Sequence, residues 1–259
     1  MKIIACIKQV PDSEAKVKAE GGAVSWGDAP LVINPFDEYA VEGALQQREA
    51  VSGSTVTALC IGPESAREAL KHALAMGADE AILISDTALN NLDTVGASRV
   101  LAAAIQKIGG VDMIVFGRQT LDTGSGVTAA QTARVLGWAM LGLVGQIKVD
   151  AQARSAHVER VIEEGRQSVT ANLPAVLSVV QSIGEPRYPS FMGIRKAGKA
   201  TIPVWSLNDL GISAPNAIIT RNELVNPPTR ETTIDIITGD SPEAIAETLV
   251  EKILAEKVL

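Results

Sequence analysis

Residues 1–140 alternate short β-branched runs with segments of helical periodicity. This alternation is typical of βα units, which build a parallel sheet with helices on its faces. We take Asp37 as the N-cap of the first helix and Gly77 as the glycine that ends the second helix. The sequence predicts strands at residues 2–8, 55–61, 81–84 and 113–116, and helices that begin at residue 37, end at residue 77, and span residues 94–107 and 127–136.

After residue 140 the pattern changes to strands with short connections, expected at residues 146–149, 157–162, 167–171 and 175–180. Glu164-Gly165 is typical of a hairpin turn between two of these strands. Antiparallel strands are common at the edge of a parallel sheet. We therefore predict an α/β fold with a mostly parallel sheet, flanking helices and antiparallel edge strands.

The C-terminal part of the chain has a different character. Residues 201–240 carry four prolines and little periodicity, so they bury little by themselves. Ser241-Pro242 is a good N-cap and N1 pair for a last helix. We expect one α/β domain over residues 1–200. Over residues 201–259 we expect an extended arm and a helix that pack on a partner subunit, the alternatives being the chain's own core or a simple extension.

The composition is that of a globular protein. The chain has 259 residues, of which 46% are hydrophobic, so it can bury a large core. Its longest apolar stretches fall short of the ~20 residues that span a bilayer. The N-terminus shows no secretory pattern, and we expect a cytoplasmic protein without a membrane span. The net charge of -7 disfavours nucleic acid as a partner.

Residues that carry metal or nucleophilic chemistry are scattered. Cys6 and Cys60 lie in expected strands and form no CxxC pair, so we interpret them as small buried hydrophobes. His72 and His157 have no partner spacing for a metal or for catalysis, and we assign them structural roles. The sequence contains no Walker motif and no Ser-His-Asp arrangement. We therefore predict no catalytic residue and no metal site, and any redox chemistry must belong to a bound cofactor.

A glycine-rich segment at residues 122–128 opens the helix that follows Gly117-Arg118-Gln119. In an open α/β sheet, ligands bind at the carboxyl ends of the strands. Free backbone N–H groups, the helix dipole, and the hydroxyls of Ser125 and Thr128 can converge there on a phosphate. We predict phosphate binding; the alternative is a glycine-rich turn that lets helix and sheet approach closely. The match of residues 124–129 to the dinucleotide fingerprint GxGxxA is weak, because that fingerprint belongs after a first strand.

Residues 186–199 form a basic, proline-punctuated arm after a buried strand. No Asp or Glu occurs between Pro186 and Asn208, although the chain is acidic. A loop longer than ten residues inside a compact domain is usually functional or disordered. Because this one carries Phe191, Met192 and Ile194 among its cations, we predict an exposed docking surface for a protein partner.

Nearly the whole chain resembles the β subunit of electron transfer flavoprotein. The resemblance is carried by residues 6–12, 33–40, 117–119 with Asp122, 158–160, 173–176 and 186–191. It implies an adenine-nucleotide α-hydrolase-like fold and a heterodimer with an α subunit that holds the electron-carrying FAD. It also implies AMP or a second FAD in this chain. The subunit would be an electron carrier, not an enzyme, that accepts electrons from acyl-CoA or related dehydrogenases and passes them to a further acceptor.

The resemblance also implies which residues contact the nucleotide and which contact a protein partner. Adenine and ribose contacts fall on Ala5, Cys6, Lys8, Asn34, Cys60, Ile61 and Gly62. Phosphate contacts fall on Asp122, Thr123, Gly124, Ser125, Gly126, Val127 and Thr128. The arm becomes the segment that recognises dehydrogenases, with Phe191 as the anchor. A hydrophobic tip among cations can bury one anchor while the charges steer an acidic partner. The partner contacts are Arg187, Tyr188, Phe191, Met192, Ile194, Arg195 and Lys196, with Lys199 near them.

Two questions stay open in the sequence. Electron-bifurcating members of the family carry FAD in the β subunit and typically have a different phosphate loop, so the departure at residues 122–129 favours AMP. Residues 10–13 and Asp93-Thr94, in contrast, look similar to the bifurcating type. The second function hypothesis is a stand-alone adenine-nucleotide-binding regulator or nucleotide hydrolase of similar fold, which leaves the arm without a function.

Overall fold

The computed structural model describes residues 1–90, 92–219, 222–229 and 234–256. The chain forms two compact units, residues 1–223 and residues 224–259. The described residues of the first unit form one large sheet, with strand order β11-β10-β9-β12-β8-β1-β6-β7-β13. Its strands are β1 (Lys2–Ile7), β6 (Thr55–Ile61), β7 (Glu80–Ile84), β8 (Met113–Gly117), β9 (Ala139–Asp150), β10 (Ser155–Ile162), β11 (Gly165–Asn172), β12 (Ala175–Val179) and β13 (Val204–Trp205).

Seven neighbouring strands of the sheet run parallel, in the order β9, β12, β8, β1, β6, β7 and β13. At one edge, β10 pairs antiparallel with β9, and β11 pairs antiparallel with β10. This arrangement confirms the predicted α/β fold. The turn between β10 and β11 lies at Glu163 and Glu164, because Ile162 pairs with Gly165. The turn predicted at Glu164-Gly165 was therefore wrong by one residue.

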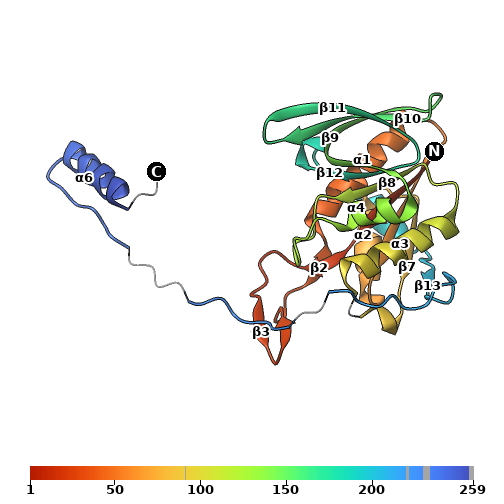
Figure 1. The fold of residues 1–259 in the computed structure, drawn as a ribbon, viewed down its shortest axis with the longest axis horizontal. Helices are drawn as coiled ribbons and strands as arrows, with labels where there is room; N and C mark the ends of the chain where they lie inside the picture. Colours follow the sequence, from red (N-terminus) through yellow and green to blue (C-terminus); the bar gives the residue numbers. More distant parts are fainter. Residues whose placement is uncertain (91, 220–221, 230–233, 257–259) are drawn as a thin grey trace. The chain divides into compact units, whose positions relative to one another are not determined.

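Helices cover both faces of the sheet (Figure 1). Successive side chains of a strand point to opposite faces. Ile3 and Ala5 of β1 accordingly pack on the side of α1 and α2, and Ile4 and Cys6 on the side of α3 and α4. Because helices cover both faces, a ligand can reach the sheet only at the ends of the strands or at its edge strands. The helices of this unit are α1 (Pro35–Ala50), α2 (Arg67–Met76), α3 (Thr94–Ile108), α4 (Thr128–Leu136) and α5 (Phe191–Ala197), with short 3₁₀ turns η1 (Glu64–Ala66), η2 (Thr87–Leu89) and η3 (Gln181–Ile183).

Helix α1 begins earlier than the sequence predicted. Its N-cap is Asn34 and its first helical residue is Pro35, whose fixed φ suits that position. The assignment of Asp37 as N-cap was wrong: this residue lies in the first turn and is buried. Helix α2 ends as predicted at Gly77, which has a φ of 130°.

Two small antiparallel pairs in residues 9–33 were not predicted. Strand β2 (Gln9–Pro11) pairs with β5 (Leu31–Ile33), and β3 (Lys18–Glu20) pairs with β4 (Ala23–Ser25). Strands of three residues are too short to show a two-residue period, so the sequence carries little signal for them. The β3–β4 hairpin projects from the layers of sheet and helices (Figure 1).

The arm at residues 186–199 was predicted as a loop but contains helix α5. Its N-cap is Ser190, whose hydroxyl accepts a hydrogen bond of 2.9 Å from the N–H of Gly193. Ala197, in the last turn, is buried in the same core cluster as the residues of α2. The arm is therefore a short helix with one side attached to the domain.

The second unit contains α6 (Pro242–Ala255). Ser241 is its N-cap, as predicted, and accepts a hydrogen bond of 3.2 Å from the N–H of Ala244. Residues 201–223 belong to the first unit, since β13 pairs with β7. The packing predicted for residues 201–259 on a partner subunit stays a prediction. Within the described ranges, no helix is long and apolar enough to cross a bilayer.

Candidate functional site

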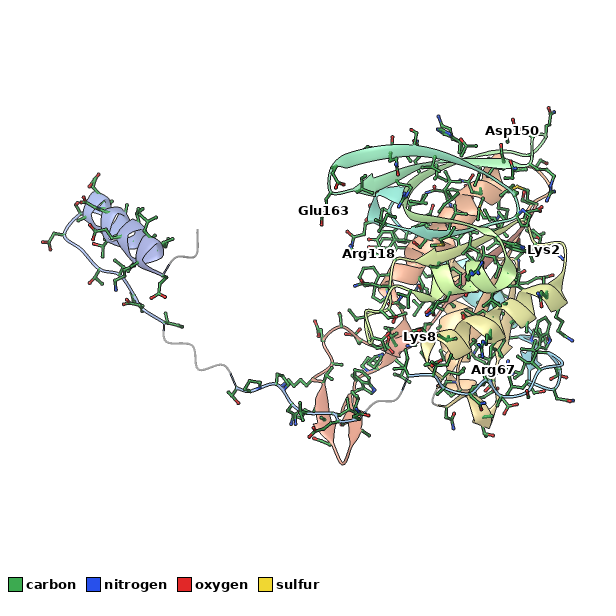
Figure 2. All side chains as sticks on the ribbon, viewed as in Figure 1. Lys2, Lys8, Arg67, Arg118, Asp150 and Glu163 are labelled. Atoms are coloured by element: carbon green, nitrogen blue, oxygen red, sulfur yellow. The ribbon has the colours of Figure 1, made fainter. Side chains whose placement is uncertain are left out.

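The carboxyl ends of β1, β6 and β8 meet at one edge of the sheet. The parallel register pairs Ile7 with Cys60 and Cys6 with Phe116. Lys8 follows β1 directly and Arg118 follows β8. In Figure 2, Lys2 and Lys8 mark opposite ends of β1, and Arg118 lies on the side of Lys8. The topology thus brings together the strand ends that the sequence selected as a binding edge.

Asn34 ties the loop after β8 to the start of α1. Its side-chain Nδ2 donates a 2.8 Å hydrogen bond to the carbonyl of Gln119, and its Oδ1 accepts a 3.1 Å bond from the N–H of Leu121. The residue is fully buried. Because both ends of the amide already have partners in the loop, Asn34 positions the loop in this structure.

Lys8 and Asp122 form an ion pair at the same edge. The Lys8 Nζ lies 2.5 Å from the Asp122 Oδ2, and the Asp122 side chain is only 14% exposed. The Asp122 Oδ1 is buried and has no hydrogen-bond partner in the described part of the chain. An ionised carboxylate has no proton to donate to a phosphate, and two anions repel each other. Asp122 can therefore orient Lys8, while the ammonium group provides the attraction for an anion.

The N-terminus of α4 is open. Val127 occupies the N-cap position, where no side chain of the described residues caps the helix. The first N–H groups of a helix have no intrahelical partner, and together with the helix dipole they attract anions. Gly124 and Gly126 precede this helix with φ values of 63° and 64°, in the left-handed region that favours glycine. A Cβ at Gly126 would also lie 3.3 Å from the carbonyl oxygen of Arg118.

A buried carboxyl group lies beneath this edge. The Asp37 Oδ2 accepts a 2.8 Å hydrogen bond from the N–H of Lys8. Burial raises the pKa of Asp37 to about 7, although hydrogen bonds from Asn34, Lys8 and Gly117 oppose the rise. A Cβ at Gly117 would lie 2.5 Å from the Asp37 Oδ1, so only glycine fits there without a shift. Asp37 thus holds the ends of β1 and β8 against the first turn of α1.

The arm presents apolar side chains to solvent. Tyr188 is 87% exposed and Phe191 is 80% exposed, and Met192 and Ile194 are exposed as well. The predicted exposure of the arm is confirmed, and its docking role stays a prediction. Arg187, in contrast, turns toward α1, where its guanidinium pairs with two carboxylates.

Residues 27–210 match the Electron transfer flavoprotein domain family. The chain belongs to the electron transfer flavoprotein family. It is 34% identical over 264 residues to the Caffeyl-CoA reductase-Etf complex subunit CarD of Acetobacterium woodii, and both chains are covered completely. It is 32% identical over 274 residues to the electron transfer flavoprotein subunit beta of Megasphaera elsdenii, again over both whole chains. A further relative, the subunit beta of Mycobacterium leprae, is 38% identical over 216 residues, which cover 81% of this chain and 80% of the relative.

These relatives confirm the predicted role as an electron transfer flavoprotein β subunit and give no support to a stand-alone regulator or hydrolase. Membership in the electron transfer flavoprotein family implies an electron carrier that associates with a flavin and with an α subunit.

The predicted nucleotide-binding residues differ in how far they are buried. Lys8, Gly62 and residues 122–128 lie at or beside the strand ends. Ala5, Cys6 and Cys60 are buried in the core, so they can reach a nucleotide only through backbone atoms. Ile61, the last residue of β6, is partly buried.

The two cysteines of this electron transfer flavoprotein subunit are buried, and its two histidines contact side chains of the same chain. Burial raises the pKa of Cys60 to about 12 and also raises the pKa of Cys6, so both thiols stay protonated at neutral pH. His72 lies 2.8 Å from a carboxylate oxygen of Glu38, and His157 hydrogen bonds to Thr170. The described residues contain no group of three or more metal-ligating side chains.

Sequence reasoning missed Asp37 as a site residue, and Glu42 and Glu49 as partners of the arm. An acidic residue in the first turn of a helix is common, because it complements the helix dipole. Asp37 therefore looked like an ordinary helix-start residue. A signal was available in the apolar spacing of α1: Val41, Ala44 and Leu45 define its core face, and Asp37 falls on the same side at i, i+4.

Proposed function

We propose that this β subunit binds AMP at the carboxyl edge of β1, β6 and β8, and that its arm docks on an electron-donating dehydrogenase. The FAD associated with the α subunit supplies the electron-carrying chemistry when it is bound. The β subunit then acts by binding and by orientation. The single observation that carries the nucleotide site is the uncapped N-terminus of α4, which follows the loop whose Asp122 pairs with Lys8.

The residues at this edge fit a phosphate. The first N–H groups of α4 provide donors, and Lys8 provides a positive charge within the same loop system. The positive φ values of Gly124 and Gly126 shape the loop without side chains that would cover these donors. The hydroxyls of Ser125 and Thr128 lie in the same segment. The adenine and ribose fall toward Gly62 and Ile61 at the end of β6.

We favour AMP over a second FAD in this chain. The proposal rests on residues 122–129, where the sequence departs from the loop typical of bifurcating members. FAD would place a second phosphate group and a flavin near the same edge. The described structure offers one open helix N-terminus in this loop, which suits one phosphate group.

The docking proposal rests on the exposed residues of the arm. Tyr188, Phe191 and Met192 form an apolar group that solubility does not require. Arg195 and Lys196 lie beside them and are exposed, so they can steer an acidic partner. We propose acyl-CoA or related dehydrogenases as the partners, and a cytoplasmic location, which cell fractionation checks.

Cofactor analysis of the purified heterodimer tests the nucleotide assignment. The β subunit is produced together with its α subunit, the protein is denatured, and flavins and adenine nucleotides are counted separately. We expect one FAD and one AMP in each heterodimer. Two FAD molecules would place FAD in the β subunit, in place of AMP. A heterodimer without any flavin would contradict the whole assignment.

A further inference from the structure

Arg187 at the base of the arm is held by two carboxylates of α1. Its Nε donates to the Glu42 Oε2 at 2.8 Å, and its Nη2 donates to the Glu42 Oε1 at 3.0 Å. Its Nη1 donates to the Glu49 Oε1 at 2.5 Å. The backbone N–H of Arg187 also donates to the Glu42 Oε2, at 3.2 Å. Two parallel N–H···O bonds fix the orientation of a guanidinium as well as its position.

The burial of Glu42 makes this pairing necessary. The Glu42 side chain is only 7% exposed, and the Glu49 side chain is 53% exposed. Burial acts to raise the pKa of Glu42, but the hydrogen bonds and charge of Arg187 outweigh it and lower the pKa. Without Arg187, a buried carboxylate would lose its only ion-pair partner among the described residues, which is costly in a protein interior.

The same face of α1 also holds the chain that leads into the arm. Glu42, Gln46 and Glu49 follow the i, i+4, i+7 spacing of one helix face. Gln46 donates a 3.1 Å hydrogen bond to the carbonyl of Ile183 and a 3.2 Å bond to Glu42. Three polar side chains in a row therefore fix the path of the backbone from Ile183 to Arg187.

The far end of the arm is attached to a different helix. A Cβ at Gly193 would lie 2.3 Å from the carbonyl oxygen of Ala75 in α2, so the two backbones are in close contact. Ala197 is 3% exposed and belongs to the core cluster that includes α2. The exposed residues Tyr188 and Phe191 lie between these two attachments in the sequence.

We propose that Glu42 and Glu49 act through Arg187 as positioning residues, which hold the apolar surface of the arm in the orientation that docks on the dehydrogenase. The inference rests on the proposed docking function. Binding of a surface that is already ordered avoids the entropy cost of ordering it on contact. It also changes the role of Arg187: the sequence assigned this residue to the partner-binding charges, whereas its donors are used within the chain.

The alternative is that Arg187 contacts the dehydrogenase directly, and the carboxylates only keep it folded back. The two roles predict opposite results for one pair of substitutions. Glu42→Gln with Glu49→Gln removes the negative charges and leaves Arg187 in place. A direct contact would be unchanged or improved by this variant, because the guanidinium is released. If the carboxylates position the arm, this variant docks less well on the dehydrogenase.

The experiment uses the complete heterodimer and an acyl-CoA dehydrogenase from the same organism, reduced by its acyl-CoA substrate. The KM for the electron transfer flavoprotein and the kcat are measured for wild type, for Glu42→Gln with Glu49→Gln, and for Phe191→Ala. We expect the KM of the carboxylate variant to rise about tenfold with little change in kcat. Glu68→Gln on α2, which removes an exposed i,i+3 pair with Lys71, is the matched control and should leave both values unchanged.

Flavin content and hydrogen exchange keep the test decisive. The flavin content of each heterodimer should equal that of wild type, and the amides of residues 191–197 should exchange faster in the carboxylate variant than in wild type. Should the double variant fail to assemble, Arg187→Lys replaces it, since lysine keeps the charge and loses the bidentate geometry. Unchanged exchange in residues 191–197, or an unchanged KM, overturns the positioning role.

Phe191→Ala separates this inference from the function on which it rests. A raised KM for Phe191→Ala, with normal kinetics of the carboxylate variant, overturns the inference and leaves the docking function in place. Normal kinetics of Phe191→Ala overturn the docking function, and the inference falls with it. A raised KM in both variants, with a normal Glu68→Gln control, supports both.

Discussion

The loop at residues 117–128 and the arm at residues 186–199 both follow a buried strand, but they are stabilised in opposite ways. The loop is held by side chains, through Asn34 and the Lys8–Asp122 pair, and leaves backbone N–H groups of α4 open. The arm has a capped helix and leaves apolar side chains open. A small anionic ligand is recognised by backbone donors, whereas a protein partner is recognised by side chains. Substitutions in each region can separate these two kinds of recognition.

Asp37→Asn should change how stability depends on pH. The folded pKa of Asp37 is about 7 and its unfolded pKa is near 4, so between these pH values the folded state holds a proton that the unfolded state has lost. The contribution of Asp37 is therefore fully present below about pH 4 and is lost as the pH rises through about 7. The free energy of unfolding falls by at most about 1.4 kcal/mol per pH unit through this one group. Urea unfolding of the heterodimer from pH 4.5 to 7.5 should show a weaker decline in the variant.

The control for Asp37 is Asp79→Asn. Asp79 also accepts a hydrogen bond from a strand N–H, that of Val56 at 2.8 Å, but its side chain is 36% exposed. The unfolding of this control is measured over the same pH range as that of Asp37→Asn. If stability declines with pH equally in Asp37→Asn and in wild type, the raised pKa of Asp37 is contradicted.

Gly117→Ala should destabilise the protein by about 3 kcal/mol, because overpacking in a tight interior forces the backbone to move. The new Cβ would meet the Asp37 Oδ1 and the carbonyl oxygen of Phe36, each at 2.5 Å. Gly142→Ala is the control, since its Cβ would have no contact closer than 3.7 Å. Urea denaturation measures both. Equal stability of the two variants would show that β8 and α1 do not need this close approach.

Phe191→Ala should slow electron transfer from the dehydrogenase and leave the flavin content unchanged. An anchor residue is worth about 2 kcal/mol on truncation, or about thirtyfold in apparent affinity. Stopped-flow reduction of the heterodimer at increasing dehydrogenase concentration measures the effect. Val204→Ala, in the edge strand β13, serves as a control with a partly exposed apolar side chain of smaller size. Equal rates for wild type and Phe191→Ala would reject the anchor assignment.

Gly126→Asp should reduce nucleotide retention by about tenfold, because a negative charge at a helix N-terminus competes with a phosphate for the same donors. Gly126→Asn has nearly the same shape and tolerates the left-handed conformation equally well, so it isolates the charge. Nucleotide released on denaturation is quantified for both heterodimers. Normal occupancy in Gly126→Asp, or an equal loss in both variants, would contradict an anion site at α4.

Much of the fold was predictable from local patterns. The period of 3.6 in α2 and α3 and the β-branched runs of β1 and β6 gave elements close to the observed ones. The candidate site was predictable in its position, since strand ends and a glycine-rich helix start are local features. The four short strands of residues 9–33 and helix α5 were missed, because three to seven residues carry too little periodicity to identify an element.

The sequence by itself determined the layers of sheet and helix, the glycine-rich helix start and the presence of an apolar, cationic arm. Only the tertiary structure decided which groups meet. Arg187 pairs with Glu42 across 145 residues of chain, and Asn34 reaches Gln119 across 85. Local periodicity reflects interactions within a few residues, whereas these pairs depend on the order in which strands assemble in the sheet. The raised pKa of Asp37 likewise exists only because folding removes its carboxyl group from water.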